Sequence, residues 1–481
     1  MPRATKIVAT LGPASSSPEV LERMIRAGVD VVRMNFSHGK AQDHIDRATL
    51  VREIAKRCGR EVAIMADLQG PKIRVGKFQG DKTFLEVGQS FVLDGSTNEL
   101  GTQERVGLDY KELPRDLRAG DILLLNDGLL KLVVDAVRGE EVHTTVVVGG
   151  ELSNNKGINK AGGGLTAPAL TGKDMEDIKT AMSFQCEYLA VSFPKTATDM
   201  EMARQLANVA GEPWRHKPQM IAKIERSEAI PALEQILRAS DGIMVARGDL
   251  AVEVGNAAVP ALQKRMIKMA REMDRVVITA TQMMESMIVN PVPTRAEVSD
   301  VANAVLDGTD AVMLSAETAA GKYPVETIEM MASICVEAEN AEEIALDATF
   351  TNKQFARIDQ SIAMGALFTA YHLGCKAILA LTESGSTALW MSRHRIHVPI
   401  YGLTSQVRTQ RRMALYRNVT PMLMPNFADR DEALARAETL LVENGVLNPG
   451  DTYAITCGEP MGYPGGTNML KVSRVIGPAR G

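Results

Sequence analysis

The sequence lacks paired cysteines, long apolar runs and an excess of basic charge. Its five cysteines stand at positions 58, 186, 335, 375 and 457, with no C-x-x-C pair among them. A scattered, odd set argues against disulfides and zinc and favours a reducing compartment, so we expect a cytoplasmic protein. No apolar stretch approaches the roughly 18–20 residues that span a bilayer. The start, M-P-R-A-T-K-I-V-A-T, is too short and polar for a secretory signal.

The formal net charge of −5 gives no basic surface, so we expect neither nucleic-acid nor membrane partners. Two common nucleotide-binding motifs are also missing. Gly172 and Lys173 are followed by Asp174, and Ala167 stands where a Walker A motif needs its first glycine. No G-x-G-x-x-G follows a predicted strand, and the seven histidines show no metal-ligand spacing. Any phosphate chemistry must therefore use another set of residues.

With 481 residues, of which 45% are hydrophobic and 23% charged, the chain is long enough for about three globular domains. Short apolar segments alternate with helical ones in two blocks. Eight strands are predicted, at 6–9, 29–34, 62–66, 188–192, 220–226, 242–246, 276–280 and 311–314. Eight strand–helix units in one core predict a (β/α)8 TIM barrel, with its active site at the carboxyl ends of the strands.

Between the blocks, residues 75–165 show short alternating strands and no convincing helix. The strands are predicted at 83–87, 90–93, 121–125, 130–137 and 142–148, followed by a flexible polar segment at 154–164. A helical stretch at 325–346 leads to a boundary at 348–358. Further strands are predicted at 377–381, 399–402, 419–422 and 453–456. We therefore expect a barrel (1–70 and 170–345), an inserted small all-β domain (71–169) and a C-terminal open α/β domain (346–481).

Polar residues collect at the predicted strand ends of the barrel. They are Arg33, Asn35, Ser37, Asp67, Arg74, Lys223, Glu225, Arg247, Asp249, Thr281 and Glu317. Lys223 and Glu225 lie two apart and so point to the same side of a strand. A cation and an anion at the rim of a core need compensating partners, although an isolated K-x-E is also typical of a structural ion pair.

Glu225 and Asp249 follow adjacent strands without His or Cys nearby, which suits Mg²⁺ or Mn²⁺ better than zinc. The cations at the strand ends supply the charge that a phosphoryl group demands. Gly248, in R-G-D-L, lets the backbone approach a ligand, and a helix beginning there would offer free N–H groups to a carboxylate. Together these features indicate phosphoryl transfer involving a small acid. Taken singly, each residue is as typical of a cap or a surface ion pair.

Six long motifs resemble the pyruvate kinase family. They are M-N-F-S-H-G at 34–39, D-L-Q-G-P-K-I-R at 67–74, I-A-K-I-E at 221–225, M-V-A-R-G-D-L at 244–250, I-T-A-T-Q-M-M-E-S-M at 278–287 and P-T-R-A-E-V-S-D-V-A-N-A-V-L-D-G-T-D at 293–310. The match runs unbroken from Thr5 to about Pro324 and continues more loosely to the C-terminal part. The resemblance implies phosphoryl transfer from phosphoenolpyruvate to ADP, giving pyruvate and ATP, the last step of glycolysis.

The resemblance also implies roles for single residues. Glu225 and Asp249 would hold the divalent metal, Lys223 would neutralise the transferring group and the enolate, and Arg33 would grip the phosphoryl group. Thr281 stands where the family places the residue that helps protonate enolpyruvate.

Further roles follow for the nucleotide and the insert. Arg74 and Lys156 would meet the nucleotide phosphates, while the N–H groups of Gly248 and Asp249 would receive the substrate carboxylate. The β insert would act as a lid that excludes water. The family also implies a homotetramer.

One departure concerns potassium. Members that need K⁺ carry Glu where this chain has Lys72, in G-P-K-I-R. The family's monovalent site would use Asn35, Ser37, Asp67 and the carbonyl of Leu68. We predict that the ammonium of Lys72 replaces K⁺ and that the enzyme is largely K⁺-independent. The alternative is that Lys72 is a solvated residue at the hinge of the lid.

A second phosphate site is predicted at T-E-S-G-S-T-A, 382–388, which follows a strand and opens a helix. Its hydroxyls and N–H groups, at Thr382, Ser384, Gly385, Ser386 and Thr387, could form a phosphate cradle or simply a capped turn. The resemblance favours an allosteric site for a phosphorylated effector. The loop at 458–468 lacks the Trp and Arg pattern of fructose-1,6-bisphosphate-activated animal forms, so we expect a sugar monophosphate or AMP.

Two other readings stay open at this point. A barrel lyase or aldolase that acts on pyruvate-like acids with Mg²⁺ would share the carboxylate pair but would not need the lid or Arg33. A metabolite-binding regulator built on an inactive barrel would be expected to have lost Lys223, Glu225 or Asp249, and all three are present.

Overall fold

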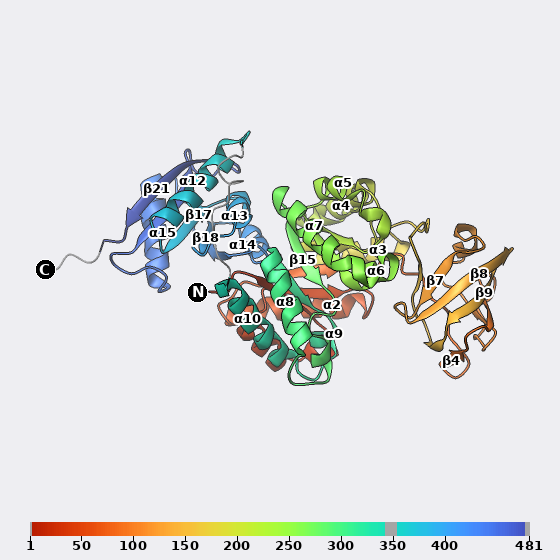
Figure 1. Ribbon diagram of the computed structural model, residues 1–481. Helices are drawn as coiled ribbons and strands as arrows, with labels where there is room; N and C mark the ends of the chain where they lie inside the picture. Colours follow the sequence, from red (N-terminus) through yellow and green to blue (C-terminus); the bar gives the residue numbers. More distant parts are fainter. Residues whose placement is uncertain (1, 342–353, 477–481) are drawn as a thin grey trace.

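The computed structural model describes residues 2–341 and 354–476 (Figure 1). An all-β body lies at one end, a barrel lies in the middle, and an α/β body with the C-terminus lies at the other end. The predicted boundary at 348–358 and the predicted domain start at 346 fall largely outside the described residues. The end of the helix predicted to reach 346 does too.

Eight parallel strands close into the predicted barrel, in the order β1-β16-β15-β14-β13-β12-β3-β2. They are β1 (Lys6–Thr10), β2 (Val31–Asn35), β3 (Ala63–Asp67), β12 (Tyr188–Val191), β13 (Gln219–Ile224), β14 (Gly242–Ala246), β15 (Val276–Ala280) and β16 (Ala311–Leu314). The register pairs Asn35 with Asp67, and Asp67 with Ala190. The polar strand ends therefore meet at one mouth of the barrel.

The barrel strands are surrounded by helices whose ends follow from local sequence. They are α1 (Pro18–Ala27), α2 (Ala41–Arg57), α3 (Gly172–Ser183), α4 (Ala197–Gly211), α5 (Leu233–Ala239), α6 (Arg247–Val254), α7 (Val259–Glu272), α8 (Arg295–Asp307), α9 (Ala316–Ala319) and α10 (Pro324–Ala341). In α1, Ser17 caps the first turn and Gly28, at φ 126°, ends the helix. None of the helices in the described ranges is long and apolar enough to cross a membrane.

The insert forms a six-stranded sheet, β11-β7-β8-β9-β5-β6, and a two-stranded one, β10-β4. Its strands are β4 (Lys82–Leu85), β5 (Ser90–Asp94), β6 (Arg105–Gly107), β7 (Ile122–Leu125), β8 (Leu130–Arg138), β9 (Glu141–Val148), β10 (Gly150–Ser153) and β11 (Ile158–Lys160). The expectation of a flexible segment at 154–164 was wrong, because β11 pairs with β7 and buries Ile158. Ile158 is a single apolar residue among polar neighbours, which is too weak a pattern to predict a strand from sequence. A short 3-10 turn, Leu113–Asp116, also interrupts the strands.

The C-terminal body is an open sheet in the order β19-β18-β17-β20-β21. Its strands are β17 (Ala377–Leu381), β18 (Ile400–Thr404), β19 (Val419–Leu423), β20 (Thr452–Gly458) and β21 (Thr467–Arg474), and its helices are α12 (Ile358–His372), α13 (Ser386–Ser392), α14 (Val407–Met413) and α15 (Arg430–Glu443). The predicted open α/β architecture is confirmed. Strand β21, antiparallel to β20, was missed because it is mostly exposed and carries no regular alternation.

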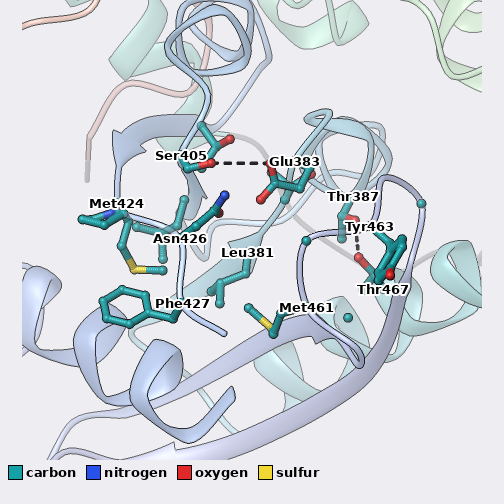
Figure 2. A pocket seen from close by; sticks show the side chains of 17 residues that line it. Leu381, Glu383, Thr387, Ser405, Met424, Asn426, Phe427, Met461, Tyr463 and Thr467 are labelled. Carbon is teal, nitrogen blue, oxygen red and sulfur yellow. Dashed lines mark hydrogen bonds between the residues drawn. The ribbon is translucent and has the colours of Figure 1, made fainter. Parts of the chain in front are cut away.

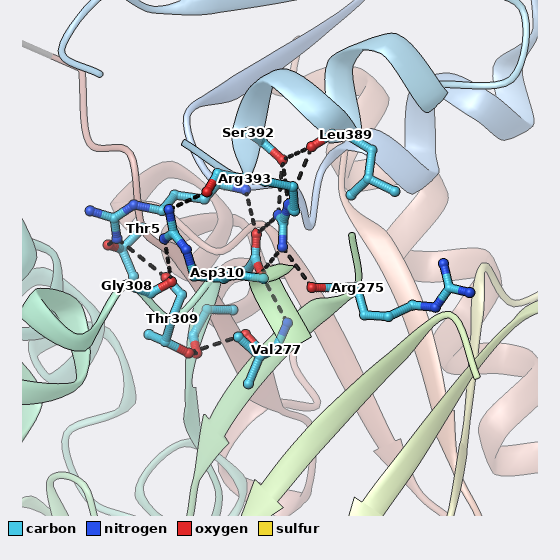
Figure 3. Close-up of polar contacts among 12 residues, drawn as sticks. Thr5, Arg275, Val277, Gly308, Thr309, Asp310, Leu389, Ser392 and Arg393 are labelled. Atoms are coloured by element: carbon cyan, nitrogen blue, oxygen red, sulfur yellow. Dashed lines mark hydrogen bonds and ion pairs between the residues drawn. The ribbon is translucent and has the colours of Figure 1, made fainter. Parts of the chain in front are cut away.

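A buried ion pair joins the C-terminal body to the foot of the barrel (Figure 3). Asp310 directly precedes β16, and its carboxylate accepts hydrogen bonds from Arg393 Nη1 at 2.9 Å and from the backbone N–H groups of Val277 and Arg417. Arg393 directly follows α13, and both side chains of the pair are almost fully buried. The two bodies therefore meet at the end of the barrel opposite its polar mouth.

Candidate active site at the mouth of the barrel

Lys223 lies at the centre of the polar mouth. Its Nζ donates to Ser192 Oγ at 2.7 Å and lies 3.1 Å from Glu225 Oε1 and 3.2 Å from Asp67 Oδ1. The three ionised side chains are buried, with Asp67 at 0%, Glu225 at 2% and Lys223 at 8% exposure. The structure thus places Lys223 and Glu225 on one side of the strand end, as their spacing predicts.

The electrostatics of this cluster follow from burial and from its charges. Burial alone would lower the pKa of Lys223, but Asp67 and Glu225 outweigh it and raise that pKa. Burial would raise the pKa of Asp67, but Arg33 and Lys223 hold it below its ordinary value. The pKa of Glu225 is raised, first by burial and then by the charges of Asp249 and Asp67, against the opposing effect of Lys223. Lys223 therefore keeps its positive charge, whereas the charge of Lys223 does not fully offset the burial of Glu225 and the repulsion from its neighbouring carboxylates.

Arg33 projects from β2 into the same cluster. Its Nε donates to Asp67 Oδ2 at 2.5 Å, and its Nη1 donates to Thr10 Oγ1 at 3.0 Å. Asp67 therefore accepts from two cations at once, one on each carboxylate oxygen. This arrangement fixes both cations at the mouth of the barrel.

Glu225 and Asp249 are the predicted metal ligands. Glu225 directly follows β13, and Asp249 lies in the first turn of α6, which follows the neighbouring strand β14. Glu225 Oε2 accepts from Phe193 N at 2.9 Å, and Asp249 Oδ1 lies 3.3 Å from Lys72 Nζ. Burial is the main cause of the raised pKa of Glu225, and the charge of Asp249 adds to it, so a divalent cation beside the two carboxylates would stabilise the ionised form of Glu225. No cluster of three or more His, Cys, Asp or Glu ligands occurs in the part of the chain that the structure describes. The pair therefore suits a hard cation that keeps water and substrate oxygens.

The four residues predicted for a monovalent cation already have protein partners for most of their oxygens. The side-chain oxygen of Asn35 accepts from the N–H of Ser37 at 3.1 Å, and the carbonyl of Leu68 accepts from Ser192 Oγ at 2.7 Å. Asp67 is held by its two cations. Lys72 Nζ donates to Asp249 Oδ1 at 3.3 Å, so this ammonium pairs with a predicted metal ligand.

Thr281 occupies an unusual backbone position just after β15. Its φ is 70°, in the left-handed region that β-branched residues rarely adopt. Its hydroxyl donates to the carbonyl of Ala280 at 2.7 Å and accepts from the N–H of Gly248 at 2.8 Å. Helix α6 begins at Arg247 as predicted, but the N–H of Gly248 is not free in this structure. Thr281 and Gly248, predicted separately, are in direct contact.

Arg247 holds this turn in place. Its guanidinium donates to the carbonyls of Ala280, at 3.1 Å, and Thr281, at 2.7 Å. A two-point pair with Asp300, at 2.7 and 2.8 Å, fixes the guanidinium itself. Asp300 lies on α8, within the motif at 293–310, but nothing in the sequence indicated that it would contact Arg247.

Arg74 and Lys156 come together at the edge of the insert. Arg74 forms a bridge with Gly157, directly after Lys156, and its Nη1 donates to the carbonyl of Asn155 at 3.0 Å. Glu317, in contrast, lies in a structural position. Its carboxylate accepts from the N–H groups of Ser315 and Met284, so it stabilises two loops.

Two further residues in the cluster were missed from sequence. Ser192 contacts Lys223 and the carbonyl of Leu68, and Phe193, at φ 57°, aims its N–H at Glu225. Both belong to S-F-P after β12, a strand end whose residues are uncharged and therefore were not singled out.

Two of the five residues predicted for a phosphate cradle, Thr382 and Thr387, line a pocket in the C-terminal body (Figure 2), whereas Ser384, Gly385 and Ser386 are not among its lining residues. Among its lining residues are Thr382, Glu383, Thr387, Ser405, Tyr463 and Thr467. The N–H of Gly385 donates to Thr382 Oγ1 at 2.9 Å, and Ser384 Oγ contacts Ser386 Oγ at 3.0 Å. These N–H and hydroxyl groups therefore also cap the turn. Tyr463, from the loop at 458–468, was not predicted as a lining residue.

The chain was compared with known proteins. The family model described as pyruvate kinase, barrel domain, matches residues 2–328, and the one described as pyruvate kinase, alpha/beta domain, matches residues 360–473. The chain is 51% identical over 478 residues to a pyruvate kinase of Buchnera aphidicola, with 98% of this chain and 99% of the relative covered. It is 52% identical over 478 residues to pyruvate kinase II of Salmonella typhimurium, with the same coverage. A crystal structure of a pyruvate kinase from Cryptosporidium parvum superposes with a TM-score of 0.91 at 31% identity, covering 98% of this chain and 96% of that chain.

Proposed function

The chain belongs to the pyruvate kinase family, and from this premise we propose how the barrel mouth performs the family's reaction. The enzyme transfers the phosphoryl group of phosphoenolpyruvate to ADP, giving pyruvate and ATP. The observation that carries the site assignment is the buried cluster of Lys223, Asp67 and Glu225, with Arg33 on the second oxygen of Asp67.

Glu225 and Asp249 would hold the divalent metal, Mg²⁺ or Mn²⁺. The two carboxylates fit a divalent metal because burial and the charge of Asp249 both raise the pKa of Glu225, and a bound cation would stabilise its ionised form. When bound, the metal polarises the oxygens of the substrate and of the transferring group. Lys72, which pairs with Asp249, can move away from that carboxylate at little cost, since its side chain is partly exposed.

Arg33 and Lys223 stabilise the charge on the phosphoryl group and on the enolate oxygen that it leaves. Both are fixed by Asp67, so their charge is preorganised at the mouth before substrate arrives. Phosphoryl transfer needs this kind of positioning more than it needs covalent chemistry from the protein.

Thr281 helps to deliver a proton to enolpyruvate, and the backbone N–H groups of Gly248 and Asp249 receive the substrate carboxylate. The N–H of Gly248 must first leave the hydroxyl of Thr281, 2.8 Å away. Substrate binding therefore frees the hydroxyl of Thr281 at the same moment, and this coupling supports both assignments.

Arg74 and Lys156, adjacent at the edge of the insert, contact the phosphates of ADP. Because both come from the insert and the metal ligands come from the barrel, the nucleotide is gripped when the insert closes as a lid. Water is thereby kept from the phosphoryl group.

Catalysis does not require K⁺. The proposal is supported by two protein cations on Asp67 and by protein donors on the oxygens of Asn35 and Leu68. Lys72 adds a positive charge on the insert side, where it pairs with Asp249 at 3.3 Å in this structure. We expect less than about a threefold change in kcat when KCl replaces tetramethylammonium chloride at constant ionic strength. A rise in kcat of more than about tenfold with KCl would refute this proposal and indicate that the chain uses the family's K⁺ site.

The pocket of the C-terminal body that Thr382 and Thr387 line binds a phosphorylated effector, a sugar monophosphate or AMP. Its hydroxyl-rich lining supports one phosphate group, while the carboxylate of Glu383 in the same lining disfavours a second. The enzyme acts in the cytoplasm as a homotetramer, as the family does.

The site assignment is tested by pyruvate formation in the E225Q and D249N variants. We expect each to lose most of its activity at low Mg²⁺ and to recover part of it at high Mg²⁺, because one ligand is weakened in each. The surface variant E234Q, from an exposed pair on α5, serves as the matched control. Full activity of both site variants at low Mg²⁺ would refute the metal assignment.

A further inference from the structure

Arg226, directly after Glu225, is a buried cation with unsatisfied donors. The residue is 3% exposed, and its Nε and Nη1 atoms have no hydrogen-bond partner among the described residues. Its guanidinium carbon lies 5.3 Å from the centre of the Phe193 ring. A contact with an aromatic face compensates a buried charge only in part. Buried donors in native proteins have partners as a rule, so these two call for an acceptor.

Arg226 is one of the residues that line a small cavity between the barrel and the insert. Phe193, Arg226, Asp249 and Glu253 are its barrel residues, and Lys72 and Asn159 are the polar residues on its insert side. The cavity is far smaller than the pockets that hold drug-sized ligands, so it suits an oxyanion better than a whole nucleotide.

The charges around the cavity select the chemistry of its occupant. Lys72 is paired with Asp249, and Glu253 accepts from the N–H of Ser227 at 2.8 Å. Arg226 is thus the cation in this lining whose donors remain open. A guanidinium matches the oxygens of a carboxylate or a phosphate better than any neutral group.

We propose that Arg226 is a further anion-binding residue of this enzyme, which takes a carboxylate or phosphate oxygen of a small acid in the cavity between insert and barrel. The acid is either the substrate, phosphoenolpyruvate, or a free oxyanion such as inorganic phosphate. In both cases the occupant touches residues of the barrel and of the insert together, so its binding favours the closed lid. The alternative in which the acid is phosphoenolpyruvate rests on the proposed function, in which Asp249 helps to hold the divalent metal.

The test compares R226Q and R226K with the wild-type enzyme. R238Q is the matched control, because Arg238 lies on the surface of α5 and pairs with the exposed Glu234. Phosphoenolpyruvate binding with Mg²⁺ and without ADP is measured by calorimetry. The rise in Tm with inorganic phosphate is measured without substrate. Turnover by the wild-type enzyme in the same preparation checks the proposed function separately.

For a substrate contact, R226Q should bind phosphoenolpyruvate at least tenfold more weakly, R226K should recover part of the affinity, and R238Q should match the wild type. For a free oxyanion, phosphate should raise the Tm of the wild type and R238Q but not of R226Q, with substrate affinity unchanged. Both results support the anion site and distinguish its source. If R226Q binds both ligands as the wild type does, Arg226 is only structural and the inference is wrong, even where R226Q is less stable.

Discussion

Replacing Lys223 by methionine is the most informative single change at the barrel mouth. The variant keeps a side chain of similar length but removes the ammonium that contacts Ser192, Asp67 and Glu225 at 2.7 to 3.2 Å. Removing one preorganised donor from a transition state typically costs a factor of about 10² to 10³ in kcat, or about 2.7–4 kcal/mol. Lys223 acts with a full charge in a buried site, so we expect a loss of at least about 10³-fold.

The same change has a smaller effect on stability. Removing one partner of a buried ion pair costs about 3–5 kcal/mol when the other charge is left alone. Here Asp67 keeps Arg33, and Glu225, whose pKa is already raised by burial, can take up a proton. We therefore expect a loss of about 1–3 kcal/mol, below that range.

The two effects are measured separately, by lactate dehydrogenase-coupled pyruvate formation and by urea unfolding. K223R is the control, because it keeps the charge and should retain most of the stability while its bulkier head reduces kcat. A kcat of K223M within tenfold of the wild type would refute the role given to Lys223. A loss of activity that only follows a loss of folded protein would refute it equally.

Three further variants test the supporting structure. Asp67 has a pKa below its ordinary value of 3.8, so its contribution to stability is complete above that value and is lost as pH falls through the lowered folded-state pKa. Urea unfolding from pH 2 to 6 should therefore show that the free energy of unfolding falls less steeply with acid in D67N than in the wild type. An equally steep fall in D67N would refute this. D300N should release Arg247 and lower kcat by about 10- to 100-fold with little change in the KM of phosphoenolpyruvate, whereas a purely structural role would leave kcat intact. D310N should leave Arg393 buried without its partner and cost about 3 kcal/mol in unfolding while the KM of the folded enzyme stays near normal; wild-type stability would contradict the interface role.

Much of the architecture could be predicted because strand periodicity and turn residues are local signals. The eight barrel strands all occur near their predicted positions, since each is a short apolar run bounded by polar residues. Strands β6, β10, β11 and β21 escaped prediction because their pairing partners, rather than their own residues, fix them as strands. The exact domain boundaries stay a prediction, since the proposed start of the C-terminal domain lies outside the described residues.

The site could be predicted as a set of residues but not as a geometry. Charged strand ends identified Lys223 and Glu225, and the barrel places them together. Sequence could not show that Lys72 reaches Asp249, because the two are far apart along the chain and belong to different bodies. Nor could it show the hydrogen bond between Gly248 and Thr281, which depends on the left-handed backbone at Thr281. Roles that depend on a bound ligand stay proposals.

The most direct test of the account is an assay of pyruvate formation from phosphoenolpyruvate and ADP with Mg²⁺, run without K⁺ and repeated with K⁺. The account predicts rapid formation of pyruvate and ATP in equal amounts under both conditions. Activity only with K⁺ would keep the reaction and refute the argument made from Asp67 and Lys72. Folded protein that forms no pyruvate in either condition would contradict the central claim that the barrel mouth transfers a phosphoryl group to ADP.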